Sequence, residues 1–225
     1  MRRADDCFSA EDRQRVNRTV GQAEAKTSAE IVPVVVTASG RYDRAEDVVG
    51  LWCGTAAVIG AWFLVPATEE APGTWGGIPP EVRLVAMVLA LVFGFLIGAT
   101  VASRAGWLRR LFTARAEMLD EVQARARSAF FDCRVHRTGG GTGLLVYVSL
   151  YERMATVIAD DTVLDKLGNA ALDDLCHGLT GDLRHGNLAD ALCLTITAAG
   201  DRLGAVLPRT SGDANELPDA LVTMD

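Results

Sequence analysis

Two long stretches without charged residues constrain this chain more than any other feature. Residues 48–66 and 84–102 are 19 residues each, and neither contains Asp, Glu, Lys or Arg. At about 1.5 Å of rise per residue, a helix of this length spans about 28 Å, close to the hydrocarbon core of a bilayer. The alternative is two buried helices in a soluble domain, but a chain of 225 residues rarely hides two such runs. The sequence therefore predicts a transmembrane hairpin with spans at residues 48–66 and 84–103.

The charges beside the two spans predict their orientation. Two arginines precede the first span and four follow the second: Arg41, Arg44, Arg104, Arg109, Arg110 and Arg115. The loop predicted at residues 67–83 holds three glutamates and a single arginine, Arg83. Because Lys and Arg are enriched on the cytoplasmic side of membrane helices, we expect both termini and the soluble domain in the cytoplasm. This is the pattern of a two-pass protein of a bacterial inner membrane, with the lipid bilayer as its partner.

Each predicted span carries two glycines that are four residues apart. The first pair is Gly50 and Gly54, and the second pair is Gly94 and Gly98. Glycines at this spacing let two helix backbones approach closely. The pairs predict tight packing within the hairpin or between two copies of the chain, and chance in a glycine-rich sequence is the alternative. Neither span has an ionisable residue in its middle, which argues against an ion pathway.

The remaining residues, 1–47 and 104–225, are predicted to form one domain that the hairpin interrupts. Ser9 followed by Asp12 is typical of a helix start, and apolar residues then recur at helical spacing. Residues 30–37 are typical of a buried strand, although Pro33 favours an edge or a bulge. Further strands are predicted at residues 143–150 and 155–160, and helices at residues 108–133, 162–179 and 188–203. This alternation predicts an α/β sandwich.

Three stretches of the predicted domain resemble a known family. They are AEAKTSAEIV at residues 23–32, TGLLVYVSL at residues 142–150 and NELPD at residues 215–219. Together these stretches are similar to the motifs of TPM-domain proteins. The resemblance implies a compact α/β fold with a central, mostly parallel sheet flanked by helices. It also implies the properties known in that family, which are acid phosphatase activity in some plant members, divalent-cation binding in others, and roles in maintaining membrane complexes.

A group of aspartates is the strongest candidate for a chemical site. Asp160 and Asp161 end a predicted strand, where open α/β sheets usually place ligands, and Asp165 follows one helical turn later. Carboxylates are suitable ligands for Ca²⁺ or Mg²⁺, and a bound metal would position and polarise a phosphate. The alternative is that Asp160 or Asp161 caps the following helix while the other carboxylates are solvated.

Charge and cysteine usage limit the remaining function classes. A net charge of −7 argues against nucleic acid as a partner, and five cysteines without CxxC spacing favour a reducing compartment. One hypothesis is a binding or adaptor module for a membrane-associated partner complex, or for a second copy of the chain. The other is a divalent-cation-dependent, acid-phosphatase-like hydrolase that uses Asp160 and Asp161.

Overall fold

The computed structural model describes residues 3–40, 42, 44–65, 78–104, 113–210 and 215–225. The chain separates into two compact units, Met1–Gly40 with Ala116–Asp225, and Arg41–Arg115. Several sequence expectations lie outside the described residues: Arg41, Arg109, Arg110, residues 67–77 of the predicted loop, and the helix start predicted at residue 108. The chain thus leaves the first unit after residue 40 and returns to it at residue 116.

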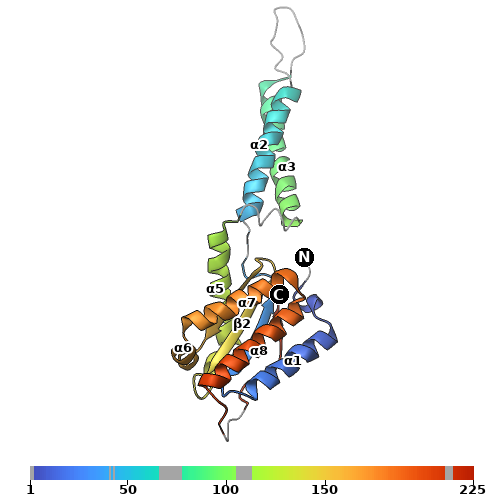
Figure 1. Cartoon of the computed structure of the whole chain (residues 1–225). Coiled ribbons are helices and arrows are strands. Elements are labelled where there is room, and N and C mark those ends of the chain that lie inside the picture. Colours follow the sequence, from blue (N-terminus) through green and yellow to red (C-terminus); the bar gives the residue numbers. More distant parts are fainter. Residues whose placement is uncertain (1–2, 41, 43, 66–77, 105–112, 211–214) are drawn as a thin grey trace, which may run out of the picture. The chain divides into compact units, whose positions relative to one another are not determined.

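A four-stranded mixed sheet forms the centre of the first unit (Figure 1). Its strands lie in the order β3-β2-β1-β4. Its strands are β1 (Glu30–Val36), β2 (Gly143–Ser149), β3 (Met154–Ala159) and β4 (Val222–Met224). β1 pairs in parallel with β2 and with β4, and β2 pairs antiparallel with β3. The expected α/β class is confirmed, and β4 is an additional strand that the sequence pattern does not predict.

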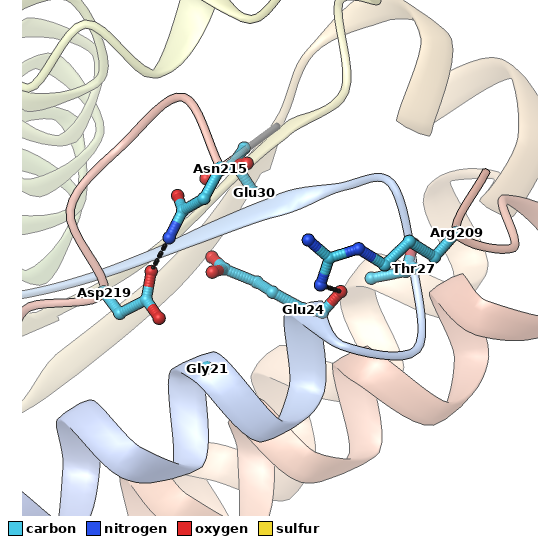
Figure 2. Close-up of a pocket in the computed structure, with 7 residues that line it drawn as sticks. All are labelled: Gly21, Glu24, Thr27, Glu30, Arg209, Asn215 and Asp219. Carbon is cyan, nitrogen blue, oxygen red and sulfur yellow. Dashed lines mark hydrogen bonds between the residues drawn. The ribbon is translucent and has the colours of Figure 1, made fainter. Parts of the chain in front are cut away.

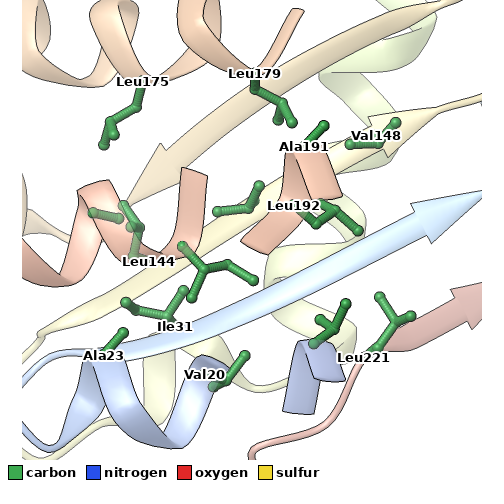
Figure 3. Packing of buried hydrophobic residues seen from close by; sticks show 14 of the residues in the cluster. Val20, Ala23, Ile31, Leu144, Val148, Leu175, Leu179, Ala191, Leu192 and Leu221 are labelled. Atoms are coloured by element: carbon green, nitrogen blue, oxygen red, sulfur yellow. The ribbon is translucent and has the colours of Figure 1, made fainter. Parts of the chain in front are cut away.

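Helices cover both faces of the sheet. One core cluster packs α1 (Ala10–Glu24), α6 (Asp161–Leu167), α7 (Asn169–His185) and α8 (Leu188–Val206) on one face (Figure 3). A second cluster packs α5 (Arg115–Asp132) on the other face. Every residue of β1 and β2 is buried. Because successive side chains of a strand point to opposite faces, both faces of these two strands are covered. Their continuous apolar sequences follow from this double burial.

Pro33 lies in β1 even though this strand has a neighbour on each side. β4 pairs with Val34–Val36, so among the described strands none pairs with this edge of β1 before Val34. The N–H groups at odd-numbered positions face this edge, since Thr37 donates to Met224 of β4 at 3.0 Å. The N–H group that proline lacks would therefore point at the open part of the edge. This is a position that tolerates proline, in agreement with the expectation of an edge or a bulge.

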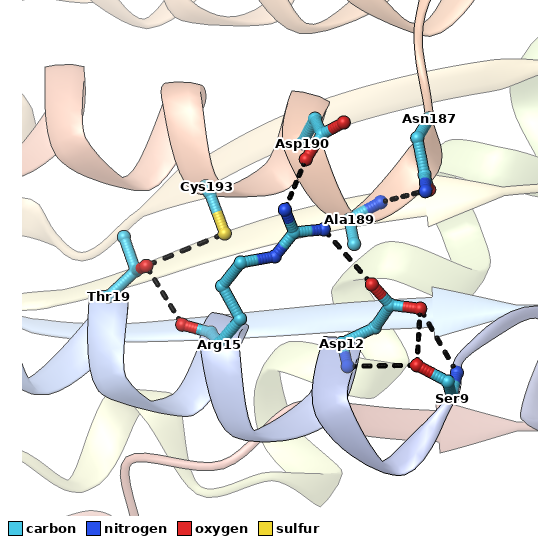
Figure 4. A network of polar contacts seen from close by, with 8 residues as sticks. All are labelled: Ser9, Asp12, Arg15, Thr19, Asn187, Ala189, Asp190 and Cys193. Carbon is cyan, nitrogen blue, oxygen red and sulfur yellow. Dashed lines mark hydrogen bonds and ion pairs between the residues drawn. The ribbon is translucent and has the colours of Figure 1, made fainter.

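A reciprocal cap starts α1 and continues into a polar network (Figure 4). The Ser9 hydroxyl accepts the N–H of Asp12 at 3.1 Å, and the Asp12 carboxylate accepts the N–H of Ser9 at 3.2 Å. Arg15 pairs with Asp12 at 3.0 Å and with Asp190 at 2.6 Å. The network joins the first turns of α1 to the first turn of α8, and the predicted helix start at Ser9 is confirmed.

Two of the predicted helices differ from the structure. The helix expected at residues 162–179 is divided at Gly168, whose φ of 79° ends α6 before α7 begins. The helix expected from residue 108 is not continuous, because Thr113 and Ala114 are not helical. Two short 3₁₀ turns, Asp5–Cys7 and Val135–Arg137, complete the described elements of this unit.

A buried carboxylate fixes the chain where it leaves β1. Glu152 is 1% exposed and accepts the N–H groups of Ser39 at 2.8 Å and Gly40 at 3.3 Å. It also accepts the hydroxyl of Ser149. The Ser39 hydroxyl in turn bonds the hydroxyl of Tyr147 at 3.0 Å, and burial raises the pKa of Tyr147 to about 12. These contacts hold the residues after β1 to the turn between β2 and β3.

In the described part of the second unit, two helices pack against each other, α2 (Arg44–Leu64) and α3 (Pro80–Arg104) (Figure 1). Residues 80–83, predicted as part of the loop, form the first turn of α3. Proline is well suited to this position of a helix. By length and composition, both helices could cross a membrane, through residues 46–64 and 80–104. Only 11% and 6% of their apolar windows are buried, unlike the core helices of a soluble domain.

Candidate functional site

An acidic pocket lies at the amino end of β1 (Figure 2). Its volume is about 40 Å³. The lining comes from the end of α1, the start of β1 and the segment before β4: Gly21, Glu24, Thr27, Glu30, Arg209, Asn215 and Asp219. The pocket thus brings three carboxyl groups together from opposite ends of the chain.

Glu24 is the last residue of α1, and it is 8% exposed. Its Oε1 accepts the N–H of Ile31 at 2.7 Å, on the edge of β1 that β4 does not reach. Its Oε2 is buried, and among the described residues it has no hydrogen-bond partner. A buried polar atom without a partner costs about 1–3 kcal/mol, and more when it is charged. One oxygen of Glu24 therefore satisfies the N–H of Ile31, and the other lies in the pocket.

Glu30, the first residue of β1, fastens the C-terminal segment to the sheet. It is 8% exposed, and its carboxylate accepts the N–H groups of Glu216 at 3.2 Å and Leu217 at 3.3 Å. These bonds hold the segment before β4 against the start of β1. Glu30, on one side of the pocket, therefore holds in place the segment that forms the other side.

Asp219 closes the pocket over α1. It accepts the side-chain amide of Asn215 and points toward Glu24 (Figure 2). Its Oδ2 lies against Gly21, where a Cβ atom would come within 2.7 Å of it. A side chain at Gly21 would therefore displace the Asp219 carboxylate.

Burial determines the charge of the pocket. It is the largest cause that raises the pKa of Glu24 from its ordinary 4.5 to about 8. The N–H bond from Ile31 acts in the opposite direction, and the nearby carboxyls of Glu30 and Asp219 add to the rise. Asp219 also raises this pKa through a hydrogen bond between the two carboxyl groups, which forms only while one of them holds a proton. Burial also raises the pKa of Glu30. At neutral pH, Glu24 therefore holds a proton in the folded chain.

Arg209 is the basic residue of the lining. Its Nη1 donates to the main-chain oxygen of Glu24 at 3.4 Å, and its main-chain N–H donates to Lys26 at 3.4 Å. The Thr27 hydroxyl donates to the main-chain oxygen of Leu207 at 2.7 Å. These bonds join the turn after α1 to the end of α8. With one basic and three acidic side chains, the pocket can hold a proton or bind a cation.

The aspartates predicted as a metal site lie at a helix start. Asp160 is the N-cap of α6 and accepts the N–H of Asp161 at 2.9 Å, while Asp161 and Asp165 are exposed. In the part of the chain that the structure describes, no group of three or more His, Cys, Asp or Glu side chains is placed to hold a metal ion. Ca²⁺ or Mg²⁺ binding there stays a prediction, and it would require ligands beyond these three side chains.

The direction of β3 changes the argument that pointed to these aspartates. Because β3 is antiparallel to β2, Asp160 lies beside the amino ends of β1 and β2. Ligands of parallel sheets bind at the opposite edge, beyond the carboxyl ends. The glycine turn before β2 lies at the same end of the sheet, where Thr162 donates to Gly140 at 2.7 Å and Gly139 donates to Glu216 at 2.6 Å. The predicted aspartates and the acidic pocket therefore lie at one end of the sheet.

The four glycines of the predicted spans lie where α2 and α3 touch. A Cβ atom would lie 2.9 Å from Phe95 at Gly50, 3.0 Å from Leu91 at Gly54, 2.8 Å from Ala57 at Gly94 and 2.7 Å from Cys53 at Gly98. By contrast, the same point at Gly60 has no described atom within 4 Å. In this structure the close approach is between the two helices of one chain.

Sequence reasoning missed the acidic pocket. Glu24 and Glu30 belong to the stretch at residues 23–32, and Asp219 belongs to NELPD, but no local spacing connects the two stretches. One signal was available in α1: Val16, Val20 and Glu24 follow one another at four-residue spacing. This spacing places the Glu24 carboxyl on the buried face of the helix, which requires a partner or a role.

No protein-family model and no curated protein matches this chain. Among solved structures, it is similar to the NMR structure of the BA42 protein from the psychrophilic bacterium Bizionia argentinensis. The similarity has a TM-score of 0.55 at 16% sequence identity, and it covers 97% of this chain and 95% of the other. At this identity the likeness concerns the fold alone.

Proposed function

We propose that this protein is a membrane-anchored binding module whose TPM-like α/β domain engages a membrane-associated partner complex. The observation that carries the proposal is the geometry of α2 and α3. Gly50, Gly54, Gly94 and Gly98 lie in the contact between the two helices, while many of their large apolar side chains are exposed. The helix pair would act as the anchor, and the α/β unit as the part that binds.

The outward surface of the helix pair suits lipid better than water. Its exposed side chains include Trp52, Phe63 and Phe93, which are 70%, 80% and 58% exposed. Soluble monomers rarely expose a continuous apolar surface of this kind, whereas the hydrocarbon of a bilayer accepts it. The glycine contacts between the helices are also the packing that membrane helices favour. Both faces of the pair therefore support a membrane anchor.

The proposed orientation places the α/β unit in the cytoplasm of a bacterial inner membrane. It rests on the arginines that flank the spans, and Arg83 is the residue that opposes it. The Arg83 guanidinium lies 4.0 Å from the centre of the Trp62 ring. A stacked arginine and indole suit the membrane interface, where aromatic rings and long basic side chains concentrate. With Arg83 stacked in this way, its charge is compatible with the outer end of the hairpin.

The TPM-like character of the domain is supported by where its motifs lie. Residues 23–32 form the end of α1 and the start of β1, and residues 142–150 include β2. The two stretches thus supply the adjacent parallel strands at the centre of the sheet. The third stretch, residues 215–219, contacts the first through Glu30 and through Asp219 at the pocket.

Arginine substitutions on the outward face of α3 test the anchor. Leu89 and Phe93 are 48% and 58% exposed, and replacing both by Arg costs about 2.5–3.5 kcal/mol per arginine near the middle of a bilayer. The matched control makes the same replacement by Arg at Leu194 and Val206 of α8, which are 59% and 37% exposed in the α/β unit. We expect the α3 variant to lose carbonate-resistant membrane association and the α8 variant to keep it. Equal behaviour of the two variants would overturn the anchor.

Reporter fusions test the orientation separately. A reporter enzyme that is active only outside the cytoplasm should be silent after Asp225 and active at Gly73. The opposite pattern would place the α/β unit outside and would contradict the proposed compartment.

A divalent-cation-dependent phosphatase at Asp160 and Asp161 is the alternative proposal. It is supported by the family resemblance and by the exposure of Asp161 and Asp165 beside Asp160. Calorimetric titration of the full chain with Ca²⁺ and Mg²⁺, next to an Asp160→Ala/Asp161→Ala variant, tests it. Saturable heat that the variant loses, together with phosphoester hydrolysis, would favour this activity. No heat in either protein would remove its basis.

A further inference from the structure

We propose that the acidic pocket of Glu24, Glu30 and Asp219 is a binding site for a primary ammonium group. The site lies within the α/β unit, so it goes beyond the proposed anchor and requires neither membrane insertion nor a given orientation. The ammonium group would come from a lysine side chain of a partner protein or from a free amine.

The second oxygen of Glu24, which has no N–H or hydroxyl donor among the described residues, is the first reason to expect a ligand. Glu24 is more than nine-tenths buried, and its Oε2 points into the pocket without a donor among the described residues. The other oxygen is already used by Ile31. Asp219, the group it faces, is itself a carboxyl, so the two can share a hydrogen bond only while one of them carries a proton. A donor from outside the chain would satisfy both when they are ionised.

The charges around Glu24 favour a cation as that donor. Glu30, Asp219 and the nearby Glu216 are acidic, and Arg209 is the basic residue of the lining. Lys26, in the turn after α1, pairs with Asp201 at 2.6 Å on the surface. Once Glu24 is ionised, acidic groups outnumber basic ones around the pocket, and an added positive charge is attracted.

The geometry favours an ammonium group over a metal ion. Ca²⁺ needs several oxygens at about 2.3–2.6 Å from one point, and Mg²⁺ needs them closer still. These carboxyl groups are not placed as a metal-binding set of three among the described residues. An ammonium group donates three hydrogen bonds of about 2.7–3.2 Å, so it reaches carboxyl groups that are further apart. A volume of about 40 Å³ accepts a compact head group but is small for a planar guanidinium.

Binding would exchange one cation for another. Near neutral pH the proton on Glu24 reduces the repulsion among the carboxyl groups of the pocket. An ammonium group can take its place only when this proton leaves. An alkylamine stays protonated up to about pH 10, so the affinity is expected to rise with pH as Glu24 ionises. The proton and the ammonium group thus compete for the same oxygen.

The experiment uses the full chain in detergent micelles. We would titrate it with butylammonium chloride at pH 6 and pH 8 and follow the amide NMR signals of Ile31, Glu216 and Leu217, whose N–H groups bond to the pocket carboxylates. Tetramethylammonium chloride, which has the same charge but no N–H donor, is the control ligand. We expect saturable shifts with butylammonium, at least tenfold tighter at pH 8 than at pH 6, and at least tenfold weaker binding of tetramethylammonium.

Two variants separate this site from general acidity. Glu24→Gln keeps an oxygen for Ile31 and should lose both the tight binding and its pH dependence, whereas Glu11→Gln removes an exposed carboxylate of α1 and should keep both. Similar shifts with both ammonium ions, or unchanged binding in Glu24→Gln, would overturn the proposal. Saturation by CaCl₂ where butylammonium fails would also overturn it, in favour of a metal. None of these readouts depends on membrane insertion, so a failure here leaves the anchor unaffected.

A second pair of probes identifies the source of the ammonium group. Nα-acetyl-lysine methylamide represents a lysine of a partner protein, and putrescine represents a free amine. Tighter binding of the lysine probe supports a protein ligand, and tighter binding of putrescine supports a small-molecule ligand. If neither binds, the proposal fails.

Discussion

Replacing Glu24 by Gln tests whether one buried carboxyl controls how stability depends on pH. The pKa of Glu24 is about 8 in the folded chain, against an ordinary 4.5. Between these two values the folded state binds more protons than the unfolded state, so the free energy of unfolding falls as pH rises. The stabilisation that protonated Glu24 provides is complete below pH 4.5 and is lost as pH rises through 8.

The size of the effect follows from the shift of the pKa. Each pKa unit corresponds to about 1.4 kcal/mol, so ionising Glu24 in the folded chain costs roughly 3–5 kcal/mol when some water enters the pocket. Gln at this position is neutral at every pH and keeps an oxygen to accept the N–H of Ile31. We therefore expect the variant and the parent to unfold within about 1 kcal/mol of each other at pH 5. At pH 9 the variant should be more stable by roughly 3–5 kcal/mol.

Urea denaturation of the full chain in micelles, followed by far-UV circular dichroism at pH 5 and pH 9, measures this difference. Burial also raises the pKa of Glu30, so both chains lose some stability with rising pH, and the difference between them isolates Glu24. Glu11→Gln, at an exposed position of the same helix, controls for the loss of one acidic charge. If the parent and Glu24→Gln lose stability equally between the two pH values, the reasoning about the buried carboxyl is refuted.

Three further substitutions test local features of the structure. Gly94→Leu should lower the thermal midpoint of the helix pair in micelles, at a cost of about 1–3 kcal/mol, while Gly60→Leu should not; equal midpoints would contradict close packing at Gly94. Asp160→Ala removes the N-cap of α6 and should lower the free energy of unfolding in urea by about 0.5–2 kcal/mol, and Asp160→Asn should restore most of it. Glu152→Ala leaves two main-chain N–H groups without their acceptor and should cost about 1–3 kcal/mol or more. Faster hydrogen exchange at those two N–H groups is the readout, and unchanged rates would contradict the role of Glu152.

Local patterns predicted the elements that local interactions determine. The reciprocal cap of α1 and the apolar runs of β1 and β2 could be found because each is a property of consecutive residues. β4 could not be found in this way, since a three-residue strand is stabilised mainly by its pairing with β1. The break at Gly168 depends on one residue with positive φ, which helical periodicity alone does not reveal.

The aspartate site was predicted from a strand that the structure contains, but without the direction of that strand. The strand before Asp160 was predicted, but the rule that ligands bind at carboxyl ends applies to parallel strands. Only a few residues separate β2 from β3, and a parallel crossover needs a dozen or more. The short connection therefore indicated that β3 runs antiparallel to β2. It also indicated at which end of the sheet Asp160 lies.

The acidic pocket depends on a chain of causes that begins with Pro33. Proline has no N–H to donate, so it favours an edge of β1 that no strand covers, and β4 begins only beyond it. The N–H of Ile31 on the same open edge then needs an acceptor, which Glu24 supplies from the end of α1. One N–H occupies one carboxylate oxygen and leaves the second in the pocket, facing Asp219. The carboxyl that accepts the N–H of Ile31 thus leaves its second oxygen in the pocket without a donor among the described residues, and the proposed ammonium site rests on this oxygen.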